Sequence, residues 1–459
     1  MNEIVLKNAL ESQREYFLSG ATLPLEFRKS MLKKLYDAVK INEDKIAEAL
    51  KEDLGKSHYE SYMCEIGLVL SEINYMLKNL KKFAREKRVN TPIAQFKAKS
   101  YVLPSPYGNV LIMSPWNYPF LLTISPLCNA LAAGNTVVVK PSAYSPATSK
   151  VVKDLLESIF TSEYVFVVTG GRAENQFLLK QKFNMVFFTG SQGVGKEVLR
   201  NCAENLTPAV LELGGKSPCI VDESANIKLS AKRIVFGKYL NCGQTCVAPD
   251  YVLCHSSVKD AFVSAVLDEI KQQFGENPLE NENYGKIINQ KHFERILSLI
   301  DNKKVVCGGE SNAEKFKIAP TVMQNVTFED VVMQEEIFGP IMPIIEFNDF
   351  NSVISDLSNK QKPLALYIFS NNKQNVKKAL NNVGFGGGCV NDVVIHLATS
   401  EMGFGGVGES GMGAYHGKVG FEAFSHFKSI VDKATWMDLP IRYQPYNKKK
   451  DKLLKKFLK

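Results

Sequence analysis

The sequence predicts an α/β protein built on a doubly wound, mainly parallel sheet of the Rossmann-like kind. From Gly108 onward, short β-branched or aromatic runs alternate with helical patterns of about ten to fifteen residues, which is the rhythm of βαβ units. The runs are continuously apolar, as expected for strands that helices cover on both faces. A second alternation begins near Asn226 and predicts a second α/β domain.

The individual elements follow from these patterns in chain order. Residues 1–90 are expected to be mainly helical, because apolar residues such as Met31, Leu32 and Leu35 recur at helical spacing. For the first sheet we expect strands at 109–113, 136–140, 164–168, 185–188 and 209–213, with helices near 120–133, 146–160, 173–181 and 193–203. For the second domain we expect strands at 251–254, 341–347, 364–369 and 389–391, a helix at 258–274, and a glycine-rich loop at 403–413.

Cysteine usage and the N-terminus indicate a cytoplasmic protein. Nine cysteines are scattered along the 459 residues without paired spacing, and the N-terminus lacks the apolar core of a signal peptide. We therefore expect reduced thiols. No run of apolar residues is long enough for a transmembrane helix, which needs about 18.

The positive charge is concentrated in the tail. Of the net charge of +8, residues 448–459 carry +6 through seven lysines and one aspartate, which leaves +2 for the rest. A nearly neutral body is not typical of a nucleic-acid-binding protein. Within the tail, Leu453, Leu454, Phe457 and Leu458 fall on one helical face, which suits either an anionic membrane or a site on the protein itself.

A glycine-rich turn follows the fourth expected strand of the first sheet. There, Gly190 and Ser191 lead into a helix that contains Gly193 and Gly195. Free amides at such a helix start could hold a pyrophosphate. The spacing departs from Gly-x-Gly-x-x-Gly, and a plain tight turn is the competing interpretation.

Two further polar side chains follow strands of the same sheet, whose ligands should bind beyond the carboxyl ends of the strands. Lys140 ends the second strand, where it could reach a ribose hydroxyl or phosphate, or remain solvated. Asn117 lies between Trp116 and Pro119 after the first strand. Its amide could donate to a developing oxyanion or cap a turn.

Cys246 lies in a small, flexible and weakly polar setting that suits a nucleophile, preceded by Gly243, Gln244 and Thr245. A free cysteine is more often a small packed hydrophobe. Glu212, however, lies among apolar and glycine residues, where desolvation should raise its pKa toward that of a working base. Together the two residues suggest covalent catalysis through a thiolate.

Other candidates carry weaker signals. Cys242 precedes Cys246 by four residues, but no matching Cys or His pair lies nearby, so we expect no metal site. Glu336, followed by Phe338, could bind ribose hydroxyls beside a flat ring, or the segment could be a solvated helix end. His396 and His416 show no triad pattern and are expected to be structural.

Together these motifs resemble those of the aldehyde dehydrogenase superfamily, and specifically its class 3-like branch of dimeric enzymes that oxidise fatty and aromatic aldehydes. The resemblance runs nearly end to end. Its strongest blocks are residues 115–119 (PWNYP), 188–191 (FTGS), 211–216 (LELGGK), 243–250 (GQTCVAPD), 335–340 (EEIFGP) and 404–408 (FGGVG).

The resemblance implies a mechanism through a thiohemiacetal and a thioester. The Cys246 thiolate attacks the aldehyde, the Asn117 amide and the Cys246 backbone N–H stabilise the oxyanion, and hydride passes to the nicotinamide. Glu212 then activates water, so that a free carboxylic acid leaves. The residues implied in cofactor binding are Lys140 at the adenosine ribose, Gly190 and Ser191 at the pyrophosphate, Glu336 at the nicotinamide ribose, Phe338 beside the nicotinamide, and Trp116 and Leu213.

One departure concerns the choice between NAD and NADP. Many NAD-preferring relatives carry a glutamate three residues after the equivalent of Lys140, whereas this chain has Ala143. An acid there would repel a 2′-phosphate, and its absence removes that repulsion. We therefore expect NADP to be accepted beside NAD.

The resemblance also implies a domain plan and a homodimer. A dinucleotide-binding domain is expected at 1–83 and 104–212, a catalytic domain at 213–391, an oligomerisation segment at 84–103 and 392–447, and a basic C-terminal helix at 448–459. The class 3-like branch ends in a similar segment that packs on the protein, which favours a docked tail over membrane contact.

Two rival functions remain. A CoA-acylating relative would share the thiolate but usually lacks the general base, so Glu212 argues against it. A non-catalytic descendant of the fold is disfavoured by the combination of Cys246, Glu212 and Asn117. The aldehyde itself cannot be read from the sequence. By position, the residues expected to line its pocket are Tyr62, Tyr118, Leu122 and Thr245.

Overall fold

The first sheet has the predicted doubly wound order. The computed structural model describes residues 3–458, so residues 1, 2 and 459 of the expected domains lie outside the described part. Five parallel strands lie in the order β7-β6-β3-β4-β5. Because β3 is flanked by β4 and β6, the topological switch point lies at the carboxyl ends of β3 and β6, where such sheets bind ligands. These strands are β3 (Asn109–Met113), β4 (Thr136–Lys140), β5 (Val165–Val167), β6 (Met185–Gly190) and β7 (Ala209–Leu213).

Four crossover helices connect these strands: α6 (Leu121–Ala133), α7 (Pro146–Ile159), α8 (Arg172–Leu179) and α9 (Gln192–Glu204). All lie within two residues of the predicted ranges. Every residue of α6 is buried, because the helix is covered by the sheet on one side and by N-terminal helices on the other. Gly134 ends α6 with a left-handed φ of 98°, a conformation that favours glycine.

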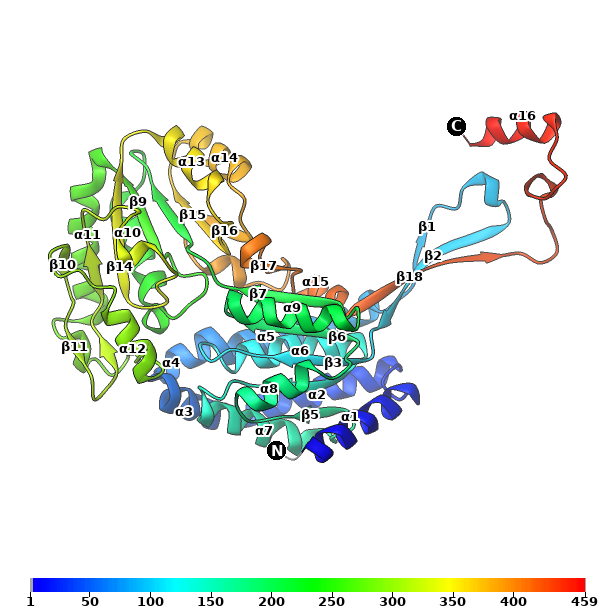
Figure 1. The fold of residues 1–459 in the computed structure, drawn as a ribbon, viewed down its shortest axis with the longest axis horizontal. Coiled ribbons are helices and arrows are strands. Elements are labelled where there is room, and N and C mark those ends of the chain that lie inside the picture. Colours follow the sequence, from blue (N-terminus) through cyan, green and yellow to red (C-terminus); the bar gives the residue numbers. More distant parts are fainter. Residues whose placement is uncertain (1–2, 459) are drawn as a thin grey trace.

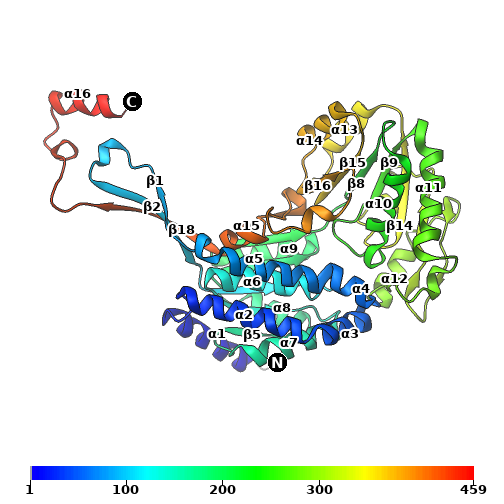
Figure 2. The ribbon, with the colours of Figure 1, turned by 180° about the vertical axis from the view of Figure 1, so that it is seen from behind.

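The predicted N-terminal helices are present and pack on the first sheet (Figures 1 and 2). α1 contacts β3 and β4, while α2 and α5 contact α6. A π-helical turn (Tyr62–Ile66) joins α4 to α5. The bounds are α1 (Glu3–Leu18), α2 (Leu25–Ile41), α3 (Glu43–Leu54), α4 (His58–Ser61) and α5 (Gly67–Phe83).

The second sheet has the order β10-β13-β14-β9-β8-β15-β16, and all of its pairs except β10 with β13 are parallel. Its strands are β8 (Pro218–Val221), β9 (Tyr251–His255), β10 (Val305–Cys307), β13 (Thr321–Met323), β14 (Ile341–Phe347), β15 (Ala365–Phe369) and β16 (Gly387–Val390). Its helices are α10 (Ile227–Tyr239), α11 (Ser256–Phe274), α12 (Gln290–Leu297), α13 (Phe350–Asn359) and α14 (Lys373–Asn382), and a small hairpin joins β11 (Ser311–Asn312) to β12 (Lys317–Ile318).

The predicted loop at 403–413 is only partly a loop. Gly411 and Met412 form the short strand β17 (Gly411–Met412), which extends the first sheet antiparallel to β7. After it, α15 (Gly417–Ala423) packs on α5 and α6. Residues 411 and 412 therefore extend the first sheet, and residues 417–423 pack on the helices α5 and α6. Glycine makes this close approach feasible, because a Cβ at Gly411 would lie 2.2 Å from the Leu211 carbonyl oxygen.

A long three-stranded arm projects from the body (Figure 1). It consists of β1 (Lys87–Val89), β2 (Ala98–Pro106) and β18 (Ser425–Lys433), with β2 in the middle. We expected the oligomerisation segment to end at residue 103 and the dinucleotide-binding domain to resume at residue 104. Strand β2 runs without interruption across this boundary, because its pairing with β18 continues to Pro106.

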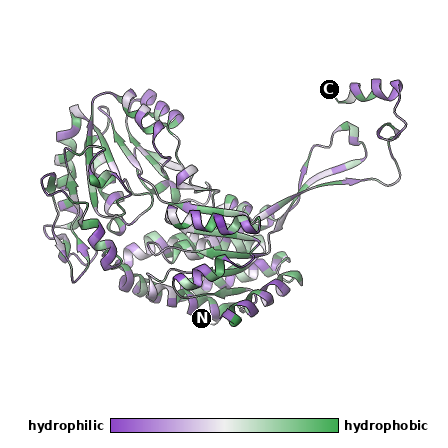
Figure 3. Ribbon diagram, viewed as in Figure 1, coloured by the Kyte–Doolittle hydropathy of each residue, from purple (hydrophilic) through white to green (hydrophobic). Residues whose placement is uncertain are grey.

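The tail differs from the expectation that it docks on the protein. Helix α16 (Lys448–Phe457) lies beyond the arm, away from both sheets (Figures 1 and 2). Leu453 and Leu454 are 46% and 44% exposed, so the chain covers these two apolar side chains only in part. Figure 3 shows the helix as mainly hydrophilic, in contrast to the strands of the two sheets. Within residues 3–458, no helix has the length and apolar character needed to cross a membrane.

Candidate active site

A cleft of about 570 Å³ lies between the two sheets and brings together the predicted site residues other than Lys140. The carboxyl ends of β3, β6 and β7 contribute its first wall, and loops of the second domain contribute the other. The predicted residues that line it are Trp116, Asn117, Gly190, Ser191, Glu212, Leu213, Cys246, Glu336 and Phe338. Residues that are distant in sequence thus meet at the switch point of the first sheet.

A rigid loop holds Cys246. Asn241 and Cys242 both adopt left-handed φ values, 50° and 52°, which are unusual for residues other than glycine. A Cβ at Gly243 would lie 2.2 Å from the Gly339 carbonyl oxygen. Gln244 secures the turn, because its amide donates to the carbonyls of Asn241 and Lys286 and accepts from the Ile288 N–H. These constraints fix the backbone immediately before the nucleophile candidate.

The Cys246 thiol is not activated by its surroundings in this structure. Burial raises its pKa well above the ordinary value, and the nearby Glu336 and Glu212 carboxylates raise it further. A cysteine with such a pKa stays protonated near neutral pH. Nucleophilic attack therefore requires a base that takes the thiol proton.

Glu212 is the most unusual group in the cleft. Both of its carboxylate oxygens are buried and have no hydrogen-bond partner. Desolvation raises its pKa well above the ordinary value. A buried carboxyl group without a partner is rare in a folded protein, and a desolvated group with a raised pKa is typical of a catalytic base.

Asn117 presents an amide to the same cleft. Its Nδ2 donates one hydrogen bond of 3.1 Å to the Gln244 carbonyl. A side-chain amide carries two donor hydrogens, so one remains for a ligand in the cleft. The next residue, Tyr118, is buried, and its hydroxyl contacts the Thr245 hydroxyl at 2.6 Å. The predicted lining residues Tyr118 and Thr245 thus connect the two loops that carry Asn117 and Cys246.

Glu336 and Phe338 lie on the opposite side of the cleft. Burial, followed by the charge of Asp250, raises the pKa of Glu336 to about 8. Gly214 leaves the room that this carboxylate occupies, because a Cβ there would lie 2.1 Å from the Glu336 Oε2 atom. The Phe338 ring meets Trp116 edge to face at 5.3 Å between centroids. Glu336 could therefore accept hydrogen bonds from hydroxyl groups of a ligand in the cleft, and Phe338 could pack against a flat ring.

The start of α9 suits an anionic ligand. Ser191 and Gln192 line the cleft, and the Ser191 side chain does not cap the helix. A Cβ at Gly193 would meet nothing within 4 Å. Unsatisfied N–H groups of the first helical turn can bind a phosphate. The start of α9 could therefore hold a phosphate or pyrophosphate group.

Lys140 differs from the expectation. It is buried and does not line the cleft, because its ammonium donates to the carbonyls of Pro141 and Gly170 at 2.9 and 2.7 Å. Burial lowers its pKa to about 8. Ala143 is exposed nearby. Lys140 thus supports the loops beyond β4 and β5, and one of the three N–H groups of its ammonium is left for another acceptor.

Two residues of α12 were missed by the sequence reasoning. The His292 ring lies 5.0 Å from Trp116, and Arg295 donates to the Glu335 carboxylate and to the Ile337 carbonyl. Both line the cleft. Their only signal was a three-residue spacing on an amphipathic helix, which many solvated helices share.

Of the remaining candidates, His396, His416 and Tyr62 are not among the residues that line this cleft. His396 contacts Cys389, and His416 stacks on Phe404; burial lowers the pKa of each histidine to about 4. Tyr62 is 43% exposed, whereas Leu122 lines the cleft. In the described part of the chain, no three His, Cys, Asp or Glu side chains form a cluster that could hold a metal ion.

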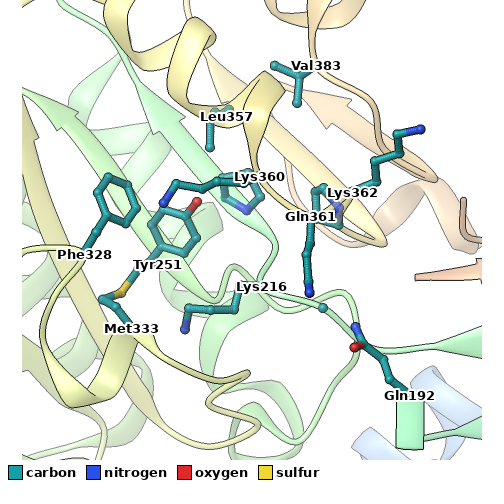
Figure 4. A pocket seen from close by; sticks show the side chains of 13 residues that line it. Gln192, Lys216, Tyr251, Phe328, Met333, Leu357, Lys360, Gln361, Lys362 and Val383 are labelled. Atoms are coloured by element: carbon teal, nitrogen blue, oxygen red, sulfur yellow. The ribbon is translucent and has the colours of Figure 1, made fainter. Parts of the chain in front are cut away.

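A second cavity of about 210 Å³ adjoins the cleft (Figure 4). The two share Gln192, Gly215, Lys216 and Gln361. The Lys216 ammonium is fully engaged, since it donates to Asp250 and to the carbonyls of Val332 and Glu335. This lysine therefore joins the segment before Glu336 to the loop after β7.

The sequence matches the aldehyde dehydrogenase family over residues 2–430. It is 44% identical to the 4,4'-diaponeurosporen-aldehyde dehydrogenase of Staphylococcus aureus (strain NCTC 8325 / PS 47), with 99% of each chain covered. It is 43% identical to aldehyde dehydrogenase family 3 member A2 of Pongo abelii, with 95% of this chain and 90% of that relative covered.

Solved structures of aldehyde dehydrogenases also resemble this chain. The substrate-bound state of Staphylococcus aureus AldH superposes with a TM-score of 0.98 at 44% identity and covers 100% of both chains. The betaine aldehyde dehydrogenase (betB) of Staphylococcus aureus in complex with NAD+ superposes with a TM-score of 0.85 at 26% identity, covering 95% of this chain and 89% of that one.

Proposed function

The chain belongs to the aldehyde dehydrogenase family and to its family 3 branch, and from that premise we propose that Cys246 is the nucleophile with which it oxidises an aldehyde to the free acid. The observation that carries the proposal is the meeting of three groups in one cleft: a thiol, an amide with a free N–H, and a buried carboxyl group without a partner. Each group has a distinct role in acyl transfer through a thioester.

The first step joins Cys246 to the aldehyde carbon. Glu212, whose raised pKa favours proton uptake, takes the thiol proton, and the sulfur attacks the carbonyl. The oxygen becomes an oxyanion that accepts hydrogen bonds from the Asn117 Nδ2–H and the Cys246 backbone N–H. The thiohemiacetal then collapses to a thioester as hydride leaves.

The second step releases the acid. Glu212 first releases to solvent the proton that it took from the thiol; it then accepts a proton from a water molecule, and the resulting hydroxide attacks the thioester carbon. The C–S bond breaks, and the departing Cys246 thiolate takes up the proton that Glu212 accepted from the water, which restores both residues to their starting state. The unpartnered oxygens of Glu212 leave its hydrogen-bonding capacity free for that water.

The cofactor is proposed to be NAD or NADP. When bound, the dinucleotide accepts the hydride. The residues proposed to hold it are Gly190 and Ser191 at the pyrophosphate, Glu336 at the nicotinamide ribose, and Trp116, Leu213 and Phe338 around the nicotinamide, with Lys140 near the adenosine ribose. The NAD+ complex of the betaine aldehyde dehydrogenase supports dinucleotide binding by this fold.

The proposed substrate is a medium or long aliphatic, or an aromatic, aldehyde. Support comes from the Staphylococcus aureus relative, whose name gives 4,4'-diaponeurosporen-aldehyde as the aldehyde that it oxidises. We propose the domain plan given under Sequence analysis and a cytoplasmic location. We also propose a homodimer formed through the arm, because Val89, Ile93 and Trp436 expose apolar surface there.

The experiment that tests this function measures NAD(P)H and acid formation from a panel of short, long and aromatic aldehydes without CoA. Wild-type protein should form one free acid per reduced cofactor. Cys246→Ala should lose aldehyde oxidation completely while retaining cofactor binding. Oxidation by Cys246→Ala at the wild-type rate would refute the mechanism, and a strict need for CoA would favour the acylating alternative.

A further inference from the structure

A fully buried ion pair lies beneath the turn that carries Asn117. The Lys56 ammonium lies 2.5 Å from the Glu65 Oε1 atom, and neither side chain has any exposed surface. The same ammonium donates to the Asn117 carbonyl oxygen at 3.1 Å and lies 4.0 Å from the centroid of the Tyr118 ring. The pair lies between α3 and α5 in sequence, far from every motif of the cleft.

Glu65 uses its other oxygen on the same turn. Its Oε2 atom accepts hydrogen bonds from the N–H groups of Phe120 and Leu121, at 2.9 and 3.1 Å. These are the first amides of α6, which have no partner within the helix. The ion pair therefore holds the segment from Asn117 to Leu121 at both of its ends.

The nucleophile loop is fixed from the same region. Asn241 Nδ2 donates to the Asn117 carbonyl at 2.8 Å and to the Gln244 carbonyl at 3.1 Å. The Asn241 backbone N–H in turn donates to Glu60, on the helix next to the π-helical turn. Asn117 thus shares one hydrogen-bond network with the loop of Cys246, because its carbonyl oxygen accepts from both Lys56 and Asn241.

We propose that Lys56 and Glu65 are positioning residues that hold the free N–H of Asn117 toward the oxyanion. The inference rests on the proposed role of Asn117. The pair touches neither substrate nor cofactor. It acts by fixing the Asn117 carbonyl and the following amides, which leaves the side chain little freedom to turn away from Cys246.

Physical reasons favour positioning over plain stabilisation. A buried ion pair contributes little net stability, because desolvation of both charges offsets their attraction. The pair does fix the orientation of the turn that carries Asn117, because it makes hydrogen bonds to three backbone atoms of that turn. An oxyanion donor must be aligned before the charge develops, and misplacement by about 1 Å can cost about 100-fold in rate.

The test is a double-mutant cycle with Asn117, measured as NADH formation in a single turnover at saturating aldehyde and cofactor. Lys56→Met should slow this step by about tenfold or more, approaching the 10²–10³-fold cost of losing an oxyanion donor. In an Asn117→Ala background, the same change should cost less than about twofold, because there is no donor left to position. If Lys56→Met slows the single turnover by the same factor with and without Asn117, the proposal is wrong.

A second readout separates positioning from general damage. Alkylation of Cys246 by iodoacetamide forms no oxyanion, so its rate should stay within about twofold of wild type in Lys56→Met. If alkylation slows as much as the single turnover, the pair acts on the loop as a whole and the proposal is wrong.

Folding is controlled by two further variants. Lys56→Met leaves Glu65 buried without a counter-ion, so the neutral pair Lys56→Met/Glu65→Gln repeats the comparison without an unpaired charge. Asp53→Asn is the matched control, because Asp53 is a buried carboxylate that caps α7 through the N–H groups of Ala147 and Thr148. It should leave the single-turnover rate unchanged. An equal loss in Asp53→Asn would overturn the inference. Wild-type protein without NADH formation would refute the proposed function instead.

Discussion

Gly411 pairs with Glu212 across the antiparallel contact between β17 and β7. The strand that carries the base candidate is thereby held on both sides, by β6 through a parallel ladder and by a two-residue strand from the C-terminal region. A segment about 200 residues distant in sequence thus completes the backbone setting of Glu212.

Gly411→Ala should lower both stability and activity. Its φ of 144° is unfavourable for other residues, and the added Cβ would meet the Leu211 carbonyl oxygen at 2.2 Å. We expect a loss of about 2 kcal/mol or more in the free energy of unfolding, together with slower acid release. Urea denaturation and steady-state kinetics measure the two effects. Gly171→Ala is the control, because nothing lies within 4 Å of a Cβ there; equal effects of both changes would contradict the argument.

Glu212→Gln should slow thioester hydrolysis. The amide is nearly the same size but cannot accept a proton from water, so kcat should fall by about 10²–10⁴-fold, the usual contribution of a general base. Because Glu212 is also proposed to take the thiol proton, NADH should form more slowly in the first turnover as well, and rapid-mixing measurements of that turnover test this step. If kcat stays within tenfold of wild type, Glu212 is not the hydrolytic base.

Glu336 should make the stability of the cofactor-free protein depend on pH. Its folded pKa of about 8 lies above its ordinary value of 4.5, so the folded state binds the proton more tightly. This contribution is fully present below about pH 4.5 and is lost as the pH rises toward 8, by at most about 1.4 kcal/mol per pH unit. Thermal denaturation from pH 5 to 9 should show that Glu336→Gln is more stable than the wild-type protein. This difference in stability should grow up to pH 8 and be constant above it. A constant difference across this range would contradict the prediction.

Ala143 should permit use of NADP. We expect the kcat/KM ratio of NAD to NADP to stay below about a thousandfold, or 4 kcal/mol. Ala143→Glu should raise the KM for NADP and leave the KM for NAD nearly unchanged, because a carboxylate repels only the 2′-phosphate. A wild-type preference for NAD above that limit would contradict the prediction.

Removal of residues 448–459 should leave the Tm of the body unchanged, because α16 lies away from both sheets of its own chain. A lower Tm would mean that the helix docks on protein in the assembled state. Co-sedimentation with vesicles rich in anionic lipid tests membrane contact: equal binding of the full-length and truncated proteins would exclude a role of the helix there.

The sequence determined much of the fold, because helical and strand periodicities are local. Strands 109–113, 136–140, 209–213 and 341–347 have the predicted bounds. The crossovers between strands also predicted the parallel order and, with it, the sheet edge at which the motifs gather. Local chemistry likewise identified Cys246, Glu212 and Asn117 as candidates.

Only the tertiary structure decided which partners surround these residues. The strand at Gly411 was hidden in a glycine-rich loop, since its pairing depends on β7 and not on its own sequence. Lys140 ends a strand as predicted, yet burial commits its ammonium to two carbonyls. Lys56 and Glu65 resemble ordinary surface charges in the sequence, and only packing shows that they are buried beneath Asn117. Periodicity records which face of an element is apolar, whereas the contacts that orient a catalytic group join segments that only the folded chain brings together.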